Sequence, residues 1–101
     1  MNILQDILDF SSAEKKTIQQ RALKLSEEVG ELSEAILSST GAPGCSYKDK
    51  TNSNVIEEAV DVMVVAISIL QAAGVSKMED LIAPFQQKLL KWQKFSKSKD
   101  E

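Results

Sequence analysis

Four acidic residues form two pairs that have the spacing of one helix face. Glu28 and Glu31 lie three residues apart, and Glu58 and Asp61 repeat that spacing. Residues three or four apart point to the same side of a helix, so each pair can converge on one spot. Acids with this spacing usually belong to a solvated surface, and that interpretation suits the first pair when it is taken alone. The second pair requires another explanation.

Glu58 and Asp61 stand in an otherwise apolar segment. Between Asn54 and Gly74 the chain has no lysine or arginine that could neutralise them. Taking an ionised carboxylate out of water costs on the order of several kcal/mol unless the charge is compensated. If the two acid-bearing helices pack side by side, four carboxylates meet and repel one another. A divalent cation between the helices resolves this conflict, so the sequence predicts a metal site.

The ligand set of this predicted site contains only oxygen. Such a set favours Mg²⁺, with Mn²⁺ as the second choice, over zinc or copper. Magnesium usually keeps several waters and takes substrate phosphates as further ligands, so the implied substrate carries a polyphosphate. The chain has no histidine, which excludes Ser-His-Asp and Cys-His nucleophilic catalysis and histidine-ligated zinc. Carboxylates and lysines would therefore carry the chemistry.

Helices must position these acids. Apolar residues recur at helical spacing through most of the chain, and Ser-x-x-Glu capping boxes at Ser11 and Ser76 mark two helix starts. Pro84 should kink or split the last helix. The pattern predicts an all-α four-helix bundle in a single domain over 1–95, followed by a disordered polar tail over 96–101. The expected elements are a short helix over 2–10, a long helix over 13–39, a loop over 40–53, a central apolar helix over 55–73 that neighbours surround, and a last helix from Ser76.

The two acidic motifs together resemble a known signature. E-E-V-G-E at Glu27 to Glu31, followed by E-E-A-V-D at Glu57 to Asp61, is similar to the EExxE...ExxD motif of the all-α nucleoside triphosphate pyrophosphohydrolases. That superfamily includes MazG-like enzymes, dimeric dUTPases and phosphoribosyl-ATP pyrophosphatases. The resemblance covers roughly residues 21–94. The chain is shorter than typical dimeric dUTPases, which favours the MazG-like type, with dUTP or phosphoribosyl-ATP as alternative substrates.

The resemblance implies a reaction and assigns roles to residues. The expected reaction converts an NTP or dNTP to the nucleoside monophosphate and pyrophosphate, with metal-activated water as the nucleophile. Mg²⁺ would be held by the four matched acids, and Glu27 would ligate a second ion or orient the attacking water. The metal ligands expected in this way are Glu28, Glu31, Glu58 and Asp61.

Several basic side chains are candidates for phosphate contacts. Lys88, Lys91 and Lys94 recur every three residues on the last helix, where members of the superfamily tend to carry phosphate-binding basic residues. Lysines near a helix C-terminus also complement its dipole, which is the simpler interpretation. Arg21 and Lys24 could contact phosphate, although ordinary ion pairs within the helix, such as Lys24 with Glu28 four residues later, are the simpler interpretation. Trp92 and Phe10 could stack on a base, although core or interface packing is the simpler expectation.

Composition limits the partners and the compartment. The formal net charge of -3 lacks the basic excess of a duplex-binding domain, so no nucleic acid partner is expected. A single cysteine, Cys45, allows no intramolecular disulfide, and the acids of the central helix argue against a membrane span, so we expect a cytoplasmic protein.

A thin core and the resemblance both predict a homodimer or homotetramer. The alternative function is a non-enzymatic helical oligomerisation or interaction module.

Overall fold

The computed structural model describes residues 2–44 and 51–100, with side chains described as far as Ser96 in the last helix. The described chain is all-α, as predicted, and contains no strand. Among its helices, none is both long and apolar enough to cross a bilayer. The elements in chain order are α1 (Ile3–Ala13), α2 (Ile18–Ser39), α3 (Asn52–Ala72), the 3-10 helix η2 (Met78–Leu81) and α4 (Ile82–Asp100).

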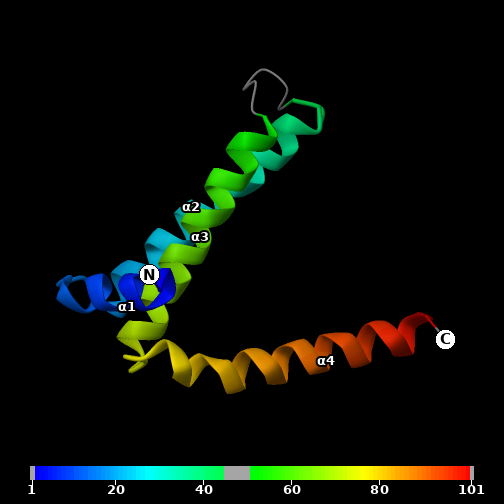
Figure 1. Ribbon diagram of the computed structural model, residues 1–101. Coiled ribbons are helices and arrows are strands. Elements are labelled where there is room, and N and C mark those ends of the chain that lie inside the picture. Colours follow the sequence, from blue (N-terminus) through cyan, green and yellow to red (C-terminus); the bar gives the residue numbers. More distant parts are fainter. Residues whose placement is uncertain (1, 45–50, 101) are drawn as a thin grey trace.

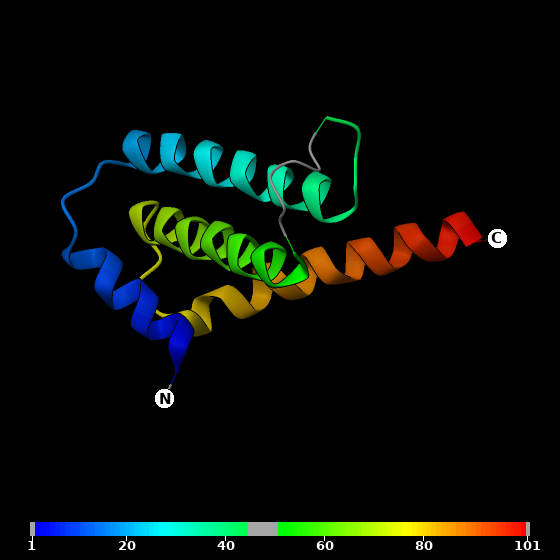
Figure 2. The ribbon, with the colours of Figure 1, turned by 90° about the horizontal axis from the view of Figure 1, so that it is seen from above.

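An antiparallel hairpin of α2 and α3 is the centre of the molecule, and α1 packs against α3 near the end of that hairpin. Figure 2 shows α2 and α3 running alongside each other over their whole length. Helix α4 leaves η2 and extends away from the hairpin (Figure 1), and in the described chain it packs against η2 but not against α1, α2 or α3. The expected four helices are present, but one chain does not close them into a bundle.

The start of α2 differs from the prediction. The chain is extended at Glu14 and at Thr17, so the long helix begins at Ile18 and not at residue 13. Thr17 is the N-cap, since its hydroxyl accepts from the Gln20 amide at 3.1 Å while the Thr17 amide donates to Gln20 Oε1 at 2.9 Å. The prediction of a capping box at Ser11 is wrong, because Ser11 lies inside α1 and is buried. A Thr-x-x-Gln capping box at Thr17 therefore starts α2, in place of the Ser-x-x-Glu box expected at Ser11.

Both helices of the hairpin end with a glycine in the left-handed region. Gly41 follows α2 with φ 73° and Gly74 follows α3 with φ 116°. At the end of α3 the amides of Gly74 and Val75 donate to the carbonyls of Gln71 and Leu70, each at 3.0 Å. This pattern satisfies carbonyls that the helix leaves unpaired, and only glycine adopts such a φ without strain. The expected stop at Gly74 is confirmed.

The other helix boundaries also differ in detail. Helix α3 begins at Asn52, inside the expected loop, with Thr51 as its N-cap; the Thr51 amide donates to Asn54 Oδ1 at 3.0 Å. Residues 45–50 of that loop lie outside the described residues. The segment after Ser76 starts as η2 and becomes α-helical at Ile82, so Pro84 stands in the first turn of α4, where a missing amide is tolerated. Helix α4 continues through Asp100, into the segment expected to be a tail.

Arg21 connects the first three helices. Its side chain is buried, and Nη1 donates to Ser11 Oγ at 2.6 Å, to the Ser68 carbonyl at 2.6 Å and to Gln71 Oε1 at 2.8 Å. Nη2 donates to the Ser11 carbonyl at 3.1 Å. The side chain of Gln5 similarly holds α1 to the segment before η2, accepting from the Met78 amide and donating to the Ser76 carbonyl. These contacts fix α1 across the open end of the α2–α3 hairpin.

The hydrophobic core of the described chain is thin. Its buried apolar members are Leu8, Ala35, Ile67 and Leu81. Helix α3 was expected to be surrounded, yet one chain leaves part of its apolar surface in solvent, since α4 does not cover it. Phe10 and Trp92 are 72% and 69% exposed, so neither belongs to the core of the single chain. The exposed apolar residues of α3 are Ile56, Val60, Met63 and Val64.

Candidate metal centre

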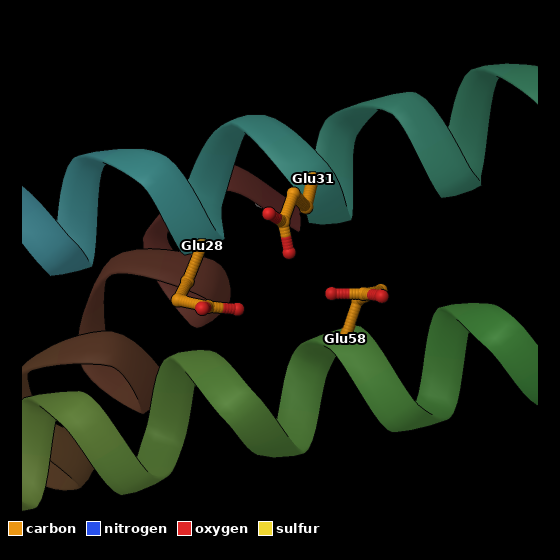
Figure 3. A group of neighbouring side chains, drawn as sticks. All are labelled: Glu28, Glu31 and Glu58. Atoms are coloured by element: carbon orange, nitrogen blue, oxygen red, sulfur yellow. The ribbon is translucent and has the colours of Figure 1, made fainter.

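Three carboxylates meet between α2 and α3. Glu28 and Glu31 extend from α2 toward α3, and Glu58 extends back from α3 into the same space (Figure 3). One oxygen atom from each of the three lies within 4.8 Å of the others. The i, i+3 spacing on α2 brings the first two together, and the antiparallel packing of α3 supplies the third. The convergence of these three residues matches the arrangement that the acid spacing predicts.

The protein itself compensates this acidic group poorly. Lys24, one turn earlier on α2, places Nζ 3.0 Å from Glu28 Oε1. The second oxygens of Glu28 and Glu58 are buried, and no described residue donates a hydrogen bond to either of them. Unpaired buried carboxylate oxygens cost free energy, because folding removes their water and returns no partner. The charge and the unpaired oxygens of these carboxylates therefore favour the binding of a cation.

Titration behaviour reflects the same crowding. The negative charge of Glu28 is the largest factor that raises the pKa of Glu31, followed by desolvation and by the neighbouring Glu58. The pKa of Lys24 is also raised, first by its hydrogen bond to Glu28 and then by the charges of Glu27 and Glu28. Like charges disfavour a further negative charge, and opposite charges favour the ammonium form. Both shifts show an excess of negative charge at this place.

The residues present fit a small divalent cation. All three groups offer carboxylate oxygen, the donor that Mg²⁺ and Mn²⁺ prefer. Two oxygens on opposite sides of a Mg²⁺ ion lie about 4 Å apart, close to the 4.8 Å within which these oxygens already lie. The buried unpaired oxygens of Glu28 and Glu58 supply the electron pairs. No large backbone movement is needed to form such a site.

Two of the predicted acids do not belong to this group of three. Asp61 is exposed on α3, one turn beyond Glu58, and its role as a fourth ligand stays a prediction. Glu27 is exposed on α2, with Oε2 3.9 Å from Lys24 Nζ. It lies next to the site without entering it, so its role with a second ion or a water molecule is also untested.

The basic candidates fall into two sets. Lys24 contacts the acidic group, and the ion pair with Glu28 expected from the sequence is present. Lys88, Lys91 and Lys94 line one hollow of α4 together with Trp92 and Phe95. Because α4 does not pack against α2 or α3, a single chain does not bring these three lysines to the carboxylates. The ion pair within the helix that was the simpler expectation for Arg21 is absent among the described residues. Its side chain instead bonds to α1 and α3, contacts that no short motif encodes.

The family model of phosphoribosyl-ATP pyrophosphohydrolase (PRA-PH) matches residues 6–89. The match covers most of the chain and includes the three convergent glutamates. The chain therefore belongs to the PRA-PH family, within the all-α NTP pyrophosphatase superfamily. The superfamily expected from the two acidic motifs is confirmed, and the matching family is the phosphoribosyl-ATP one, where the sequence favoured the MazG-like type. Searches of curated proteins and of solved structures found no match.

Proposed function

We propose that this protein is a Mg²⁺-dependent nucleotide pyrophosphohydrolase that cleaves a nucleoside polyphosphate between the α and β phosphates. The observation that carries the proposal is the convergence of Glu28, Glu31 and Glu58, with two of their buried oxygens unpaired. The family supports a pyrophosphohydrolase of the all-α type. A scaffold without a cation has no physical reason to keep this repulsive group, so the interaction-module alternative explains the structure less well.

We assign a separate role in the reaction to each residue of the site. Glu28, Glu31 and Glu58 would hold the metal, and Asp61 would join them after a rotation of its side chain. Bound Mg²⁺ would lower the pKa of a ligated water and neutralise charge on the phosphates. Glu27, at the edge of the site, would orient the attacking water, and Lys24 would contact phosphate. No protein nucleophile is required, which agrees with a chain that has no histidine.

Two substrate classes are candidates. The acidic motifs are compatible with a common NTP or dNTP, the substrate class expected from the sequence. The PRA-PH match favours phosphoribosyl-ATP, a nucleotide that also carries an α,β-phosphoanhydride. Both undergo the same reaction at the same metal group, so the proposed chemistry does not depend on the choice.

A pyrophosphate-release screen tests this function. The purified protein is incubated with Mg²⁺ and each common NTP, each common dNTP and phosphoribosyl-ATP, and the released pyrophosphate and nucleotide product are quantified. We expect at least one substrate to give a monophosphate and pyrophosphate in equal amounts, with loss of the reaction in EDTA. Release of orthophosphate alone, or no Mg²⁺-dependent release from any substrate, would contradict the proposal.

We also propose that the active form is a homodimer or homotetramer. Helix α4 exposes Phe85, Leu89 and Trp92 and carries Lys88, Lys91 and Lys94, with no acidic residue before Asp100. The α2–α3 hairpin exposes apolar residues and carries an excess of acids. The two surfaces are complementary in hydrophobicity and charge, yet they do not meet within one chain. A second copy is the partner that matches both.

A further inference from the structure

Arg21 is a buried cation whose described partners are all neutral. Only 5% of its surface is exposed, and its hydrogen bonds go to a hydroxyl, an amide oxygen and two backbone carbonyls. None of the ion pairs among the described residues includes Arg21. Burying a charge costs free energy that neutral acceptors offset less fully than an anion would. The guanidinium is thus held rigidly while its charge stays uncompensated.

Arg21 also lines a small pocket between α1, α2 and α3. The pocket has a volume of about 140 Å³, and its polar lining includes Lys16, Lys24, Ser11 and Ser68 together with the arginine, while Val64 and Val65 form its apolar part. Glu14 is the one acidic residue of the lining, and it lies 3.5 Å from Lys16 Nζ. The lining therefore contains three cationic side chains and one carboxylate. Such a pocket has the positive charge to bind an anion.

Lys24 joins this pocket to the carboxylate group. The same side chain lines the pocket and bonds to Glu28. A cation bound by Glu28, Glu31 and Glu58 would compete with Lys24 for the Glu28 carboxylate and leave its ammonium group available to the pocket. An anionic group held beside Arg21 would then lie one side chain away from the metal. A basic pocket and an acidic site in direct contact suit a substrate whose polyphosphate spans both.

We infer that this pocket, formed by Lys16, Arg21 and Lys24 with Ser11 and Ser68, binds the terminal phosphates of the substrate, the part that leaves as pyrophosphate. The inference rests on the proposed function. Pockets that enclose a molecule the size of a nucleoside usually measure about 300 Å³ or more, so 140 Å³ suits phosphoryl groups better than a base and sugar. Arg21 supplies the fixed charge, and the two lysines supply mobile contacts that close around the anion.

Titration with inorganic pyrophosphate tests the pocket without any turnover. Isothermal titration calorimetry in EDTA should show saturable binding to the wild-type protein. Lys16→Gln should weaken that affinity about three- to tenfold, the effect of losing one charge-assisted contact. The Lys16 side chain is largely exposed, so the variant should keep its fold, which circular dichroism verifies. The matched control is Lys15→Gln, which removes the same charge one residue away, outside the pocket lining.

The result that overturns the inference is equal pyrophosphate affinity in Lys16→Gln and Lys15→Gln, or no saturable binding by the wild type. Amide chemical shifts give the location independently, since Ser11 and Ser68 should respond to pyrophosphate. The two proposals fail separately. Binding in EDTA that Lys16→Gln weakens supports the pocket even if no nucleotide is hydrolysed. If the protein hydrolyses nucleotides with Mg²⁺ but gives either of the two results that overturn the inference, the proposed function stands and the proposed phosphate pocket is wrong.

Discussion

Glu31 is the residue at which repulsion inside the acidic group can be measured. Glu28 is the main cause of the raised pKa of Glu31, with smaller effects from desolvation and Glu58. A raised pKa means that the folded protein holds this proton more tightly than the unfolded chain does. The stabilisation from Glu31 is therefore complete below its unfolded pKa and is lost as the pH rises through the folded pKa. At neutral pH the ionised side chain carries the full repulsion.

We predict that Glu31→Gln becomes more stable relative to the wild type as the pH rises from about 4 to 7 in EDTA, because glutamine cannot acquire the repelling charge. Melting temperatures of both proteins across this pH series measure the difference. With saturating Mg²⁺ the relative gain should vanish or reverse, since the cation neutralises the group. A difference that stays constant with pH in EDTA would show that Glu31 does not experience the repulsion.

Metal linkage is a second test at this scale. A cation that binds the folded carboxylate group and not the unfolded chain must stabilise the fold in proportion to the logarithm of its concentration. Millimolar Mg²⁺ or Mn²⁺ should raise the melting temperature, whereas NaCl of equal ionic strength should do much less. Identical melting curves in Mg²⁺ and in EDTA would rule out a shared site. Glu58→Gln should reduce the metal-dependent rise.

The convergence of three acids could be predicted from sequence, but the side-chain position of the fourth acid could not. Helical periodicity predicts which residues share a face, and in the structure Glu28, Glu31 and Glu58 lie together between α2 and α3. Their role as metal ligands stays a prediction. Asp61 follows Glu58 by the same three residues that separate Glu28 and Glu31, yet its side chain is exposed and lies outside the group. The role of Arg21 depends on partners from α1 and α3, far away in the sequence.

At the scale of elements, capping decides where α2 begins. Ser11 and Glu14 have the letters of a capping box, but Ser11 is buried in α1 and bonded to Arg21. Tertiary packing therefore selected Thr17 and Gln20 as the box that starts the helix. Local motifs predicted that a break exists between α1 and α2 and placed it a few residues too early. The glycine at the end of α3 was predictable, because its positive φ follows from local geometry alone.

The capping box of α2 can be tested directly. Thr17→Ala removes the hydroxyl that accepts from the Gln20 amide, and we expect a loss of about 1 kcal/mol in the free energy of unfolding. Urea denaturation measures the change. Ser33→Ala, at an exposed position inside α2, is the control and should be neutral or slightly stabilising, because alanine favours helix. Equal effects of the two substitutions would contradict the assigned N-cap.

At the scale of the whole molecule, one chain is more open than a compact domain of its length. Its radius of gyration is 16.6 Å, whereas a compact domain of this length has about 13 Å. It exposes 7742 Å², while a compact monomer of 11.1 kDa exposes about 5,700 Å². The excess is comparable with the area that obligate dimers bury. Among the described elements, α4 packs only against η2 (Figure 1), and its large apolar side chains are exposed.

We predict that the protein is a dimer or tetramer at micromolar concentration. Light scattering coupled to size exclusion should give a mass of two or four chains and not the 11.1 kDa of one. Trp92→Glu should shift the mass downward, because a charge on the exposed apolar face of α4 opposes association. Gln93→Glu on the same helix is the control and should leave the mass unchanged. A monomeric wild-type protein would contradict the proposed assembly.

The most direct test of the central claim compares the wild type with Glu58→Gln, the α3 member of the carboxylate group. The substitution keeps the size of the side chain and removes one repelling charge, so the metal-free variant should be as stable as the wild type or more stable. We predict that Mg²⁺-dependent pyrophosphate release from the best nucleotide of the screen falls about 100-fold or more, because the metal is lost or displaced. Near-wild-type release by a folded Glu58→Gln protein would contradict the account.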